Sequence, residues 1–276
     1  MTADLHLHTT CSDGRLGPAA VIEAAAARGL AVVAVVDHDV LSGFDEAVEA
    51  GRRLGVEVLA GVELTAAWRG RTCHLLGYGF DPAAPRLVEA LERVRAAAQA
   101  AVSGALDVLR ARGYPLTDAD VAGFRARYPT PTTLLLALVR RRLLRSRTDL
   151  VALLPLLRAS TPGLPAAEAI VLLHAAGGAA VLAHPGRRSR GVPLDGDALA
   201  ALAADGLDGV EVEHPVHGPT ERAAYAALTA QLGLIATGGS DWHGRPRDAG
   251  PGALGTSGEA LEALRERIRR RASAPA

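Results

Sequence analysis

Short hydrophobic runs of strand length alternate with longer helical segments through most of this chain. Ala31–Val36 is wholly apolar, as buried parallel strands are. Phe44–Leu54 then has a helical pattern that Gly55 ends, and Val56–Leu64 is the next strand-like run. Repeated units of this kind predict an α/β fold with a parallel sheet that is either open or closed into a barrel.

The remaining elements follow the same alternation. Further strands are expected at Ala3–Thr9, Cys73–Gly79, Ala179–Ala183, Gly209–Glu213 and Leu234–Thr237. Further helices are expected from Gly17-Pro18 to Gly29, after Pro85, and at Ala166–Ala176, Asp197–Ala204, Thr220–Leu232 and Ser257–Arg271. The alternation therefore covers both ends of the chain but not its middle.

The middle of the chain, from about Ala101 to Pro165, has segments that are helical throughout. Thr117 with Asp120 resembles a capping box, and Thr130-Pro131 resembles a helix start. We therefore expect one α/β domain formed by residues 1–100 and 166–276, interrupted by a small all-helical insertion at residues 101–165.

The composition narrows the classes of function. The 276 residues include 30 basic and 30 acidic side chains, and this balance argues against non-specific binding of nucleic acid or anionic membranes. Every basic residue is arginine, which excludes lysine Schiff-base chemistry and a P-loop lysine. No run has membrane-spanning length and no signal peptide is visible, so we expect a cytoplasmic protein. Cys11 and Cys73 form no CxxC motif and are interpreted as packing residues.

Histidine and carboxylate side chains gather at the ends of the predicted strands. His6 and His8 lie two apart on one strand, so both project from the same face. The other members of this set lie on or follow the strands: Asp13, His38, Glu63, His74, His184, Asp241 and His243. Because the carboxyl ends of parallel strands share one rim, we expect these side chains to converge. They are too many for one tetrahedral zinc and suit two or three divalent ions such as Zn, Mn or Fe.

The residues also carry a resemblance to a known family. The motifs DLHLHTTCSDG, VDHD, GVE, CHLLGY, AHP and SDWHG resemble, in order, those of the PHP (polymerase and histidinol phosphatase) family. The resemblance implies a distorted (β/α)7 barrel with a trinuclear metal site. One metal would be held by His6, His8, Glu63 and Asp241. A second would share Glu63 and add His74 and His184, and a third would be held by Asp13, His38 and His243.

Within that family, HAAGGAAVLAHPGR is most similar to small stand-alone phosphoesterases with a helical insertion. Members of this group act on nucleoside 5′-monophosphates and 3′,5′-bisphosphates, or trim short RNA. The resemblance therefore implies hydrolysis of a phosphomonoester of a nucleotide-like substrate. A hydroxide bridging two metals would attack the phosphorus in line.

For several other titratable side chains near the motifs, two interpretations of the role stay open. Arg187 and Arg188 follow His184 and are either phosphate clamps or solvated loop arginines. His214 and His217 either protonate the leaving oxygen and contact the substrate, or are rim histidines without a role. Asp39 either orients an imidazole or caps the next helix.

Two features favour a structural interpretation. His174 lies within a predicted helix and is expected to be structural. A basic run on a predicted helix could guide an anionic substrate, but a solvated face is favoured; the run consists of Arg140, Arg141, Arg142, Arg145 and Arg147.

Three other functions stay open. They are a phosphodiesterase on cyclic phosphates or a 5′–3′ exoribonuclease on short RNA, a histidinol phosphatase, and a non-catalytic metal-binding domain. The sequence leaves the metal, the natural substrate and the oligomeric state undetermined.

Overall fold

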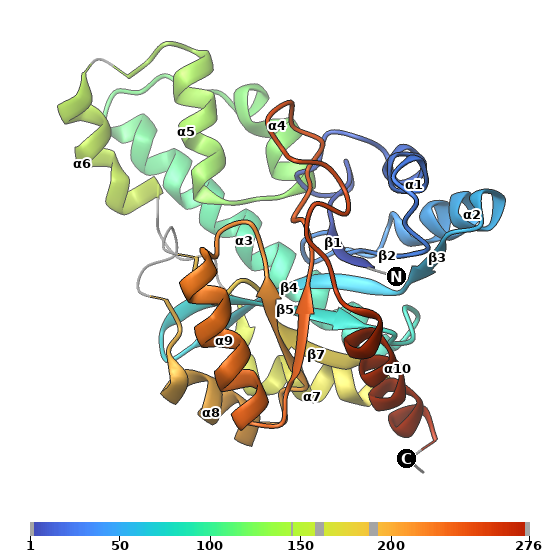
Figure 1. Ribbon diagram of the computed structural model, residues 1–276. Coiled ribbons are helices and arrows are strands. Elements are labelled where there is room, and N and C mark those ends of the chain that lie inside the picture. Colours follow the sequence, from blue (N-terminus) through green and yellow to red (C-terminus); the bar gives the residue numbers. More distant parts are fainter. Residues whose placement is uncertain (1–2, 145, 158–162, 188–192, 274–276) are drawn as a thin grey trace.

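Two β-sheets form the centre of the fold (Figure 1). The computed structural model describes residues 3–144, 146–157, 163–187 and 193–273. The smaller sheet is parallel and has the order β1 (Asp4–Leu7), β2 (Val32–Val35), β3 (Glu57–Leu59). The larger sheet has the order β6 (Leu164–Pro165), β4 (Gly61–Trp68), β5 (Arg71–Tyr78), β7 (Ala179–Leu182), β8 (Gly209–Glu213), β9 (Ile235–Gly238).

Among the described residues, backbone pairing between the two sheets is limited to single bridges at their seams. Leu7 pairs with Trp242 at one seam, and His38 pairs with Glu63 at the other. The run Val56–Leu64, expected as one strand, is divided between β3 in one sheet and β4 in the other. A side chain at Gly61 would lie 2.8 Å from the Val35 carbonyl oxygen, so glycine lets the chain cross there. The fold is α/β, and closure of a (β/α)7 barrel stays a prediction.

The expectation of a parallel sheet was wrong for three neighbouring strands. β4 runs antiparallel to β5, and β5 runs antiparallel to β7. The reason is the turn between β4 and β5, which contains only Arg69 and Gly70, with φ of +47° and +74°. Positive φ at both central residues is the geometry of a type I′ hairpin turn, and a two-residue connection can join only antiparallel strands.

Helices cover the outer faces of both sheets (Figure 1). The smaller sheet shares an apolar cluster with α1 (Pro18–Ala27) and α2 (Phe44–Leu54). The larger sheet is covered by α7 (Ala166–Ala175), α8 (Gly196–Ala204), α9 (Pro219–Gln231) and α10 (Gly258–Ala272). Each lies close to the range that the sequence predicts. Cys73 packs in the apolar core of the larger sheet, and Cys11 is half-buried.

The predicted helical segment stands apart from the sheets at the far end of α3 (Pro85–Ala111) (Figure 1). It contains α4 (Asp118–Arg127), α5 (Pro131–Arg140) and α6 (Arg147–Leu157). These helices and the second half of α3 share their own apolar cluster, which includes Leu106, Leu134 and Leu138. The expected domain boundary at residue 100 falls inside α3, which continues without interruption to Ala111. The division into two domains therefore stays a prediction. The capping box of Thr117 and Asp120 is confirmed.

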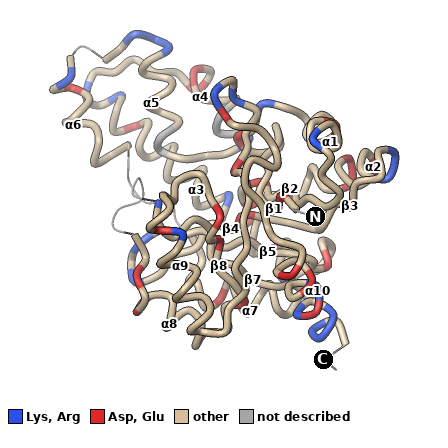
Figure 2. Tube along the Cα trace, viewed as in Figure 1, with Lys and Arg blue, Asp and Glu red and all other residues tan. Residues whose placement is uncertain are grey.

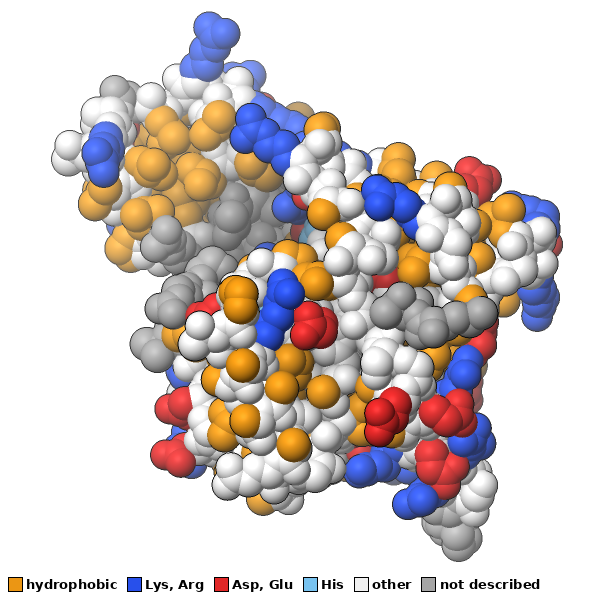
Figure 3. Space-filling model, in the orientation of Figure 1, with side chains coloured by type: hydrophobic (Ala, Val, Ile, Leu, Met, Phe, Trp, Pro, Cys, Tyr) orange, Lys and Arg blue, Asp and Glu red, His pale blue; other side chains and the backbone are white. Residues whose placement is uncertain are grey.

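The surface of the helical segment carries both apolar and basic side chains. Leu136 and Val139 of α5 are exposed, and Figure 3 shows apolar atoms on this part of the molecule. Figure 2 shows basic positions along the same segment. Arg140 and Arg142 are exposed, as expected for a solvated face, and Arg141 contacts Asp120, whereas Arg145 lies outside the described residues. No described helix combines the length and the apolar content that crossing a bilayer requires.

A buried carboxylate fastens α10 to the body of the fold. Asp208 has no solvent exposure and accepts hydrogen bonds from both terminal nitrogens of Arg271, at 2.9 and 2.7 Å. It also accepts from the Ala180 amide and contacts Nε2 of His174 at 2.9 Å, which gives His174 the structural role expected of it. Burial alone would raise the pKa of Asp208, but His174 and Arg271 outweigh it and lower the pKa.

Replacing Asp208 by alanine is expected to lower the free energy of unfolding by about 3 kcal/mol, because the substitution leaves buried donors and a guanidinium without their acceptor. Thermal or urea denaturation measures this loss. Asp205→Ala, three residues away on the surface, is the matched control and is expected to change stability by less than about 0.5 kcal/mol. Equal stability of the two variants would contradict the assignment.

Candidate metal centre

The two sheets and the loops that follow their strands bring together the side chains that the sequence singled out. His6 lies on β1 and His8 follows it; Glu63 and His74 lie on the hairpin strands β4 and β5. The others come from loops: Asp13, His38, His184, Asp241 and His243. All are buried except Asp13 and Asp241, whose side chains are 26% and 10% exposed. The expected convergence is thus present.

The Glu63 carboxylate lies at the centre of this cluster. Its Oε2 is 3.3 Å from Nε2 of His6, 3.3 Å from Nε2 of His8 and 3.2 Å from Nδ1 of His38. Its Oε1 is 2.9 Å from Nε2 of His184 and contacts Nδ1 of His74. One carboxylate therefore has five imidazoles around it, and the resemblance implies that two metals would share it.

Two further carboxylates stand on either side of His8. Asp241 Oδ1 is 3.2 Å from Nε2 of His8 and 3.4 Å from Nε2 of His6. Asp13 Oδ1 is 3.1 Å from Nε2 of His243 and 3.7 Å from Nδ1 of His8. The candidate ligand atoms form overlapping groups within 4.8 Å of one another, so the centre has room for more than one ion.

Several buried polar atoms of the centre fit a metal ion better than a hydrogen-bond partner. Within the described parts of the chain, both ring nitrogens of His8, Nδ1 of His38, Nε2 of His214 and Oδ1 of Asp13 make no hydrogen bond. Such atoms are costly to bury without a partner. A borderline divalent cation prefers this mixture of imidazole and carboxylate donors. The residues present therefore fit the expected metal.

Burial and neighbouring carboxylates shift the pKa values of the imidazoles in this cluster in opposite directions. Burial alone would lower the pKa of His8, but the carboxylates of Asp241 and Glu63 outweigh it and raise the pKa to about 10. For His184, burial prevails and lowers the pKa to about 3, so its ring is neutral and able to donate a lone pair to a metal at neutral pH. Burial raises the pKa of Asp39 to about 6, against the hydrogen bonds from Thr65.

Carboxylates behind the cluster hold its members in place, and the sequence motifs did not assign this role. Glu211 on β8 contacts Nδ1 of His6 at 2.7 Å and accepts from the His184 amide at 2.9 Å. Asp37 accepts from the Thr9 amide and hydroxyl, and thereby fixes the loop after His8. The available signal for Glu211 was an acidic residue between two valines, Val210 and Val212, of a predicted strand.

The expected roles of Asp39 were both wrong. Its carboxylate accepts from the amide and the hydroxyl of Thr65, each at 2.7 Å, and so ties the loop after β2 to β4. The N-cap of α2 is Gly43. Asp39, His184 and Asp241 have φ of +54°, +29° and +51°, which side chains other than glycine rarely adopt. Strained backbone therefore concentrates at this centre.

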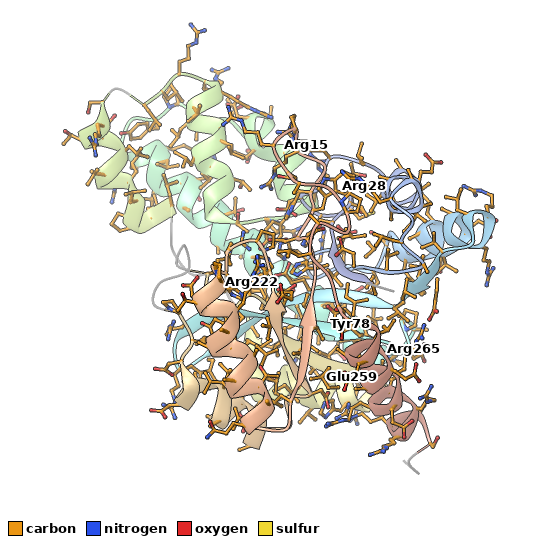
Figure 4. All side chains as sticks on the ribbon, in the orientation of Figure 1. Arg15, Arg28, Tyr78, Arg222, Glu259 and Arg265 are labelled. Carbon is orange, nitrogen blue, oxygen red and sulfur yellow. The ribbon has the colours of Figure 1, made fainter. Side chains whose placement is uncertain are left out.

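His214 and Arg187 lie at the centre, whereas His217 is used elsewhere. Nε2 of His214 is 3.3 Å from Asp241 Oδ2. Arg222, labelled at the start of α9 in Figure 4, donates to the His214 carbonyl. Arg187 Nη1 is 3.5 Å from both His184 Nε2 and Asp241 Oδ2. Both ring nitrogens of His217 are occupied, by the Val212 carbonyl and the Gly186 amide. His217 therefore holds the loop after β7, with its ring 5.6 Å from that of His214, and its contact with substrate stays a prediction. Arg188 lies outside the described residues.

One contribution from the helical segment had no sequence signal. The ring of Tyr128, between α4 and α5, stacks on His38 with centroids 3.9 Å apart and planes within 5°. The Arg127 carbonyl beside it accepts from Arg95 of α3. The helical segment therefore reaches the centre and covers the His38 side.

Known proteins resemble this chain over most of its length. The PHP domain model matches residues 4–135. The 3′,5′-nucleoside bisphosphate phosphatase of Chromobacterium violaceum is 34% identical over 87% of this chain and 86% of its own. The phosphoribosyl 1,2-cyclic phosphate 1,2-diphosphodiesterase of Eggerthella lenta is 35% identical over 89% and 95%. The structure of a candidate metal-dependent phosphoesterase from Bifidobacterium adolescentis has 33% identity, 96% coverage of both chains and a TM-score of 0.82. Similarity at this level, together with the cluster around Glu63, shows that the chain belongs to the PHP domain family.

Proposed function

We propose that this protein is a metal-dependent hydrolase that cleaves phosphomonoesters of nucleotide-like substrates. The observation that carries the proposal is the buried cluster in which five imidazoles surround Glu63, with Asp241 beside it.

Two or three divalent ions are proposed for the centre, with Mn, Zn or Fe as the metals that its imidazole and carboxylate donors suit. The proposed ligands are those that the resemblance implies: His6, His8, Asp13, His38, Glu63, His74, His184, Asp241 and His243. When bound, such ions supply Lewis-acid chemistry that neutralises phosphoryl oxygens and generates a nucleophile from water near neutral pH.

The remaining side chains of the centre supply binding and proton transfer. Arg187 lies partly exposed at the edge of the cluster, where its guanidinium can hold two oxygens of a phosphoryl group. His214 Nε2 points at the Asp241 side and is the proposed donor of the proton to the leaving oxygen. The buried walls around Glu63 limit the water that reaches the reacting atoms.

The substrate class rests on the relatives. The phosphatase relative acts on a nucleoside bisphosphate, and the Eggerthella lenta relative acts on a cyclic phosphate. The similarity to the Eggerthella lenta enzyme makes phosphodiester cleavage the alternative function. A phosphodiester differs from a phosphomonoester only by its second ester bond to phosphorus.

Protein with a measured metal content should be assayed on AMP, adenosine 3′,5′-bisphosphate, histidinol phosphate, a cyclic phosphate and the dinucleotide pApA. We expect inorganic phosphate to be released from the nucleotide monoesters. Release of a mononucleotide from pApA, or opening of the cyclic phosphate without turnover of AMP or the bisphosphate, would favour the phosphodiesterase. A lack of turnover on every compound would reject the enzyme assignment.

A further inference from the structure

The connection between α4 and α5 places an aromatic ring against the candidate metal centre. The ring of Tyr128 stacks on the imidazole of His38, with centroids 3.9 Å apart and planes 5° from parallel. Tyr128 belongs to the helical segment, whereas His38 follows β2 in the smaller sheet. Two parts of the fold that have separate apolar clusters therefore meet at one proposed metal ligand.

The chain that carries Tyr128 is stiffened by proline. Pro129 follows Tyr128 directly and is buried. Proline disfavours helical backbone at the preceding residue, which explains why α4 ends at Arg127. Pro131 then begins α5 after the N-cap Thr130. With two prolines so close together, the connection has few alternative conformations.

Arg95 of α3 links this connection to the loop that carries His38. Its Nη1 donates to the Arg127 carbonyl at 3.1 Å, next to Tyr128. Burial raises the pKa of Asp39, next to His38, and the charge of Arg95 opposes that rise. The first half of α3 packs in the core of the larger sheet, and its second half packs in the cluster of the helical segment (Figure 1). One continuous helix therefore connects the α4–α5 connection with the sheet core.

The orientation of His38 has a different origin from that of His6. Nδ1 of His6 contacts Glu211 at 2.7 Å, and Glu211 is outside the proposed ligand set. Both ring nitrogens of His38 face proposed ligands instead: Nδ1 lies 3.2 Å from Glu63, and Nε2 lies 3.9 Å from Asp13. A ligating imidazole is normally oriented by a group that does not itself bind the metal. For His38, a contact with the face of the ring can supply that orientation.

We propose that Tyr128 is a positioning residue: by stacking on His38 it orients that ligand, and the helical segment thereby sets the affinity for one metal ion. The inference rests on the proposed function through its ligand set, in which His38, Asp13 and His243 would hold one ion. A ring against the imidazole face leaves both nitrogens at the edge able to bind, and it restricts rotation about the Cβ–Cγ bond. A ligand that is already oriented binds more tightly, because less conformational entropy is lost on binding.

The test is a titration of the metal-free, full-length protein with Mn²⁺ or Zn²⁺, followed by calorimetry and by the metal content per chain. Tyr128→Leu removes the aromatic face and keeps an apolar side chain, whereas Tyr128→Phe keeps the ring. Val139→Ala, at an exposed position of α5, is the matched control in the same segment. For Tyr128→Leu we expect the apparent dissociation constant of one ion to rise about tenfold. Tyr128→Phe and Val139→Ala should match the wild type.

A double substitution identifies the ion concerned. His243→Gln removes a ligand that would share an ion with His38. Adding Tyr128→Leu to His243→Gln should weaken metal binding no further, because both substitutions act on the same ion. The proposal is overturned if Tyr128→Leu binds metal like the wild type, if Tyr128→Phe or Val139→Ala loses as much affinity as Tyr128→Leu, or if the effects of Tyr128→Leu and His243→Gln are additive.

A second readout needs neither metal nor turnover. In the metal-free protein the ring current of Tyr128 shields the imidazole C–H protons of His38. Their NMR signals should move downfield in Tyr128→Leu and keep their positions in Tyr128→Phe. Unchanged signals in Tyr128→Leu would show that the rings do not stack, and the proposal would be wrong.

Failure of the proposed function gives a different result. A wild-type protein that binds ions but hydrolyses no phosphoester would reject the enzyme assignment, and the metal titrations would still decide the role of Tyr128. A wild-type protein that binds no divalent ion would overturn both proposals. Normal hydrolysis with unchanged metal binding in Tyr128→Leu would overturn the positioning role alone.

Discussion

Glu63→Gln is expected to reduce kcat/KM for any phosphomonoester substrate by at least about 10³-fold, because one substitution disturbs every part of the cluster. The carboxylate contacts five imidazoles, and one of its oxygens lies 3.2–3.3 Å from His6, His8 and His38. Glutamine has nearly the same shape but no charge, and its amide nitrogen cannot be a metal ligand. Loss of bound metal should accompany the loss of activity.

The measurements are steady-state kinetics and the metal content per chain, with thermal unfolding as the check on folding. Glu57→Gln is the matched control, because Glu57 lies on the surface strand β3 and pairs with Arg265 at 2.5 Å. An exposed pair contributes little, so this control should retain activity and metal. Full activity of Glu63→Gln with its metal retained would remove the basis of the proposed function.

Glu211→Gln is expected to weaken metal binding and activity by about 10- to 100-fold while leaving the ligands themselves unchanged. Glu211 acts through its contact with Nδ1 of His6, which fixes the tautomer that presents Nε2 to the cluster. Its other oxygen accepts the amide of His184, a residue held at φ +29°. Without the carboxylate, both ligands lose their orientation.

A positioning role is separated from a merely structural one by titrating the metal-free protein with Mn²⁺ or Zn²⁺. The apparent dissociation constant should rise in Glu211→Gln, whereas the melting temperature of the metal-free protein should change little. Glu213→Gln is the control on the same strand, since its side chain is 44% exposed and pairs with Arg222. The same metal affinity in the wild type, Glu211→Gln and Glu213→Gln would show that Glu211 does not orient the ligands.

The histidine pattern predicted the centre because strand geometry alone places His6 and His8 on one face. Their rings lie 5.1 Å apart in the structure. For His74 the same reasoning was incomplete, because the hairpin turn at Arg69 and Gly70 reverses β5. His74 reaches the shared rim from the first half of an antiparallel strand. It pairs with Thr65, which follows Glu63 by two residues on β4.

The supporting residues were harder to predict than the candidate ligands. The roles of Glu211 and Asp37 depend on partners far along the chain: His6 lies 205 residues from Glu211. Tyr128 depends on how the helical segment folds back onto His38.

The sequence by itself determined the α/β class, the ranges of most helices and strands, and the identity of the candidate metal ligands. It could do so because periodicity, strand-end placement and ligand chemistry are properties of short segments. The tertiary structure decided the pairing into two sheets, the reversed strand β5 and the carboxylates behind the histidines. These depend on long-range contacts, whose partners are fixed only when the whole chain packs into one arrangement.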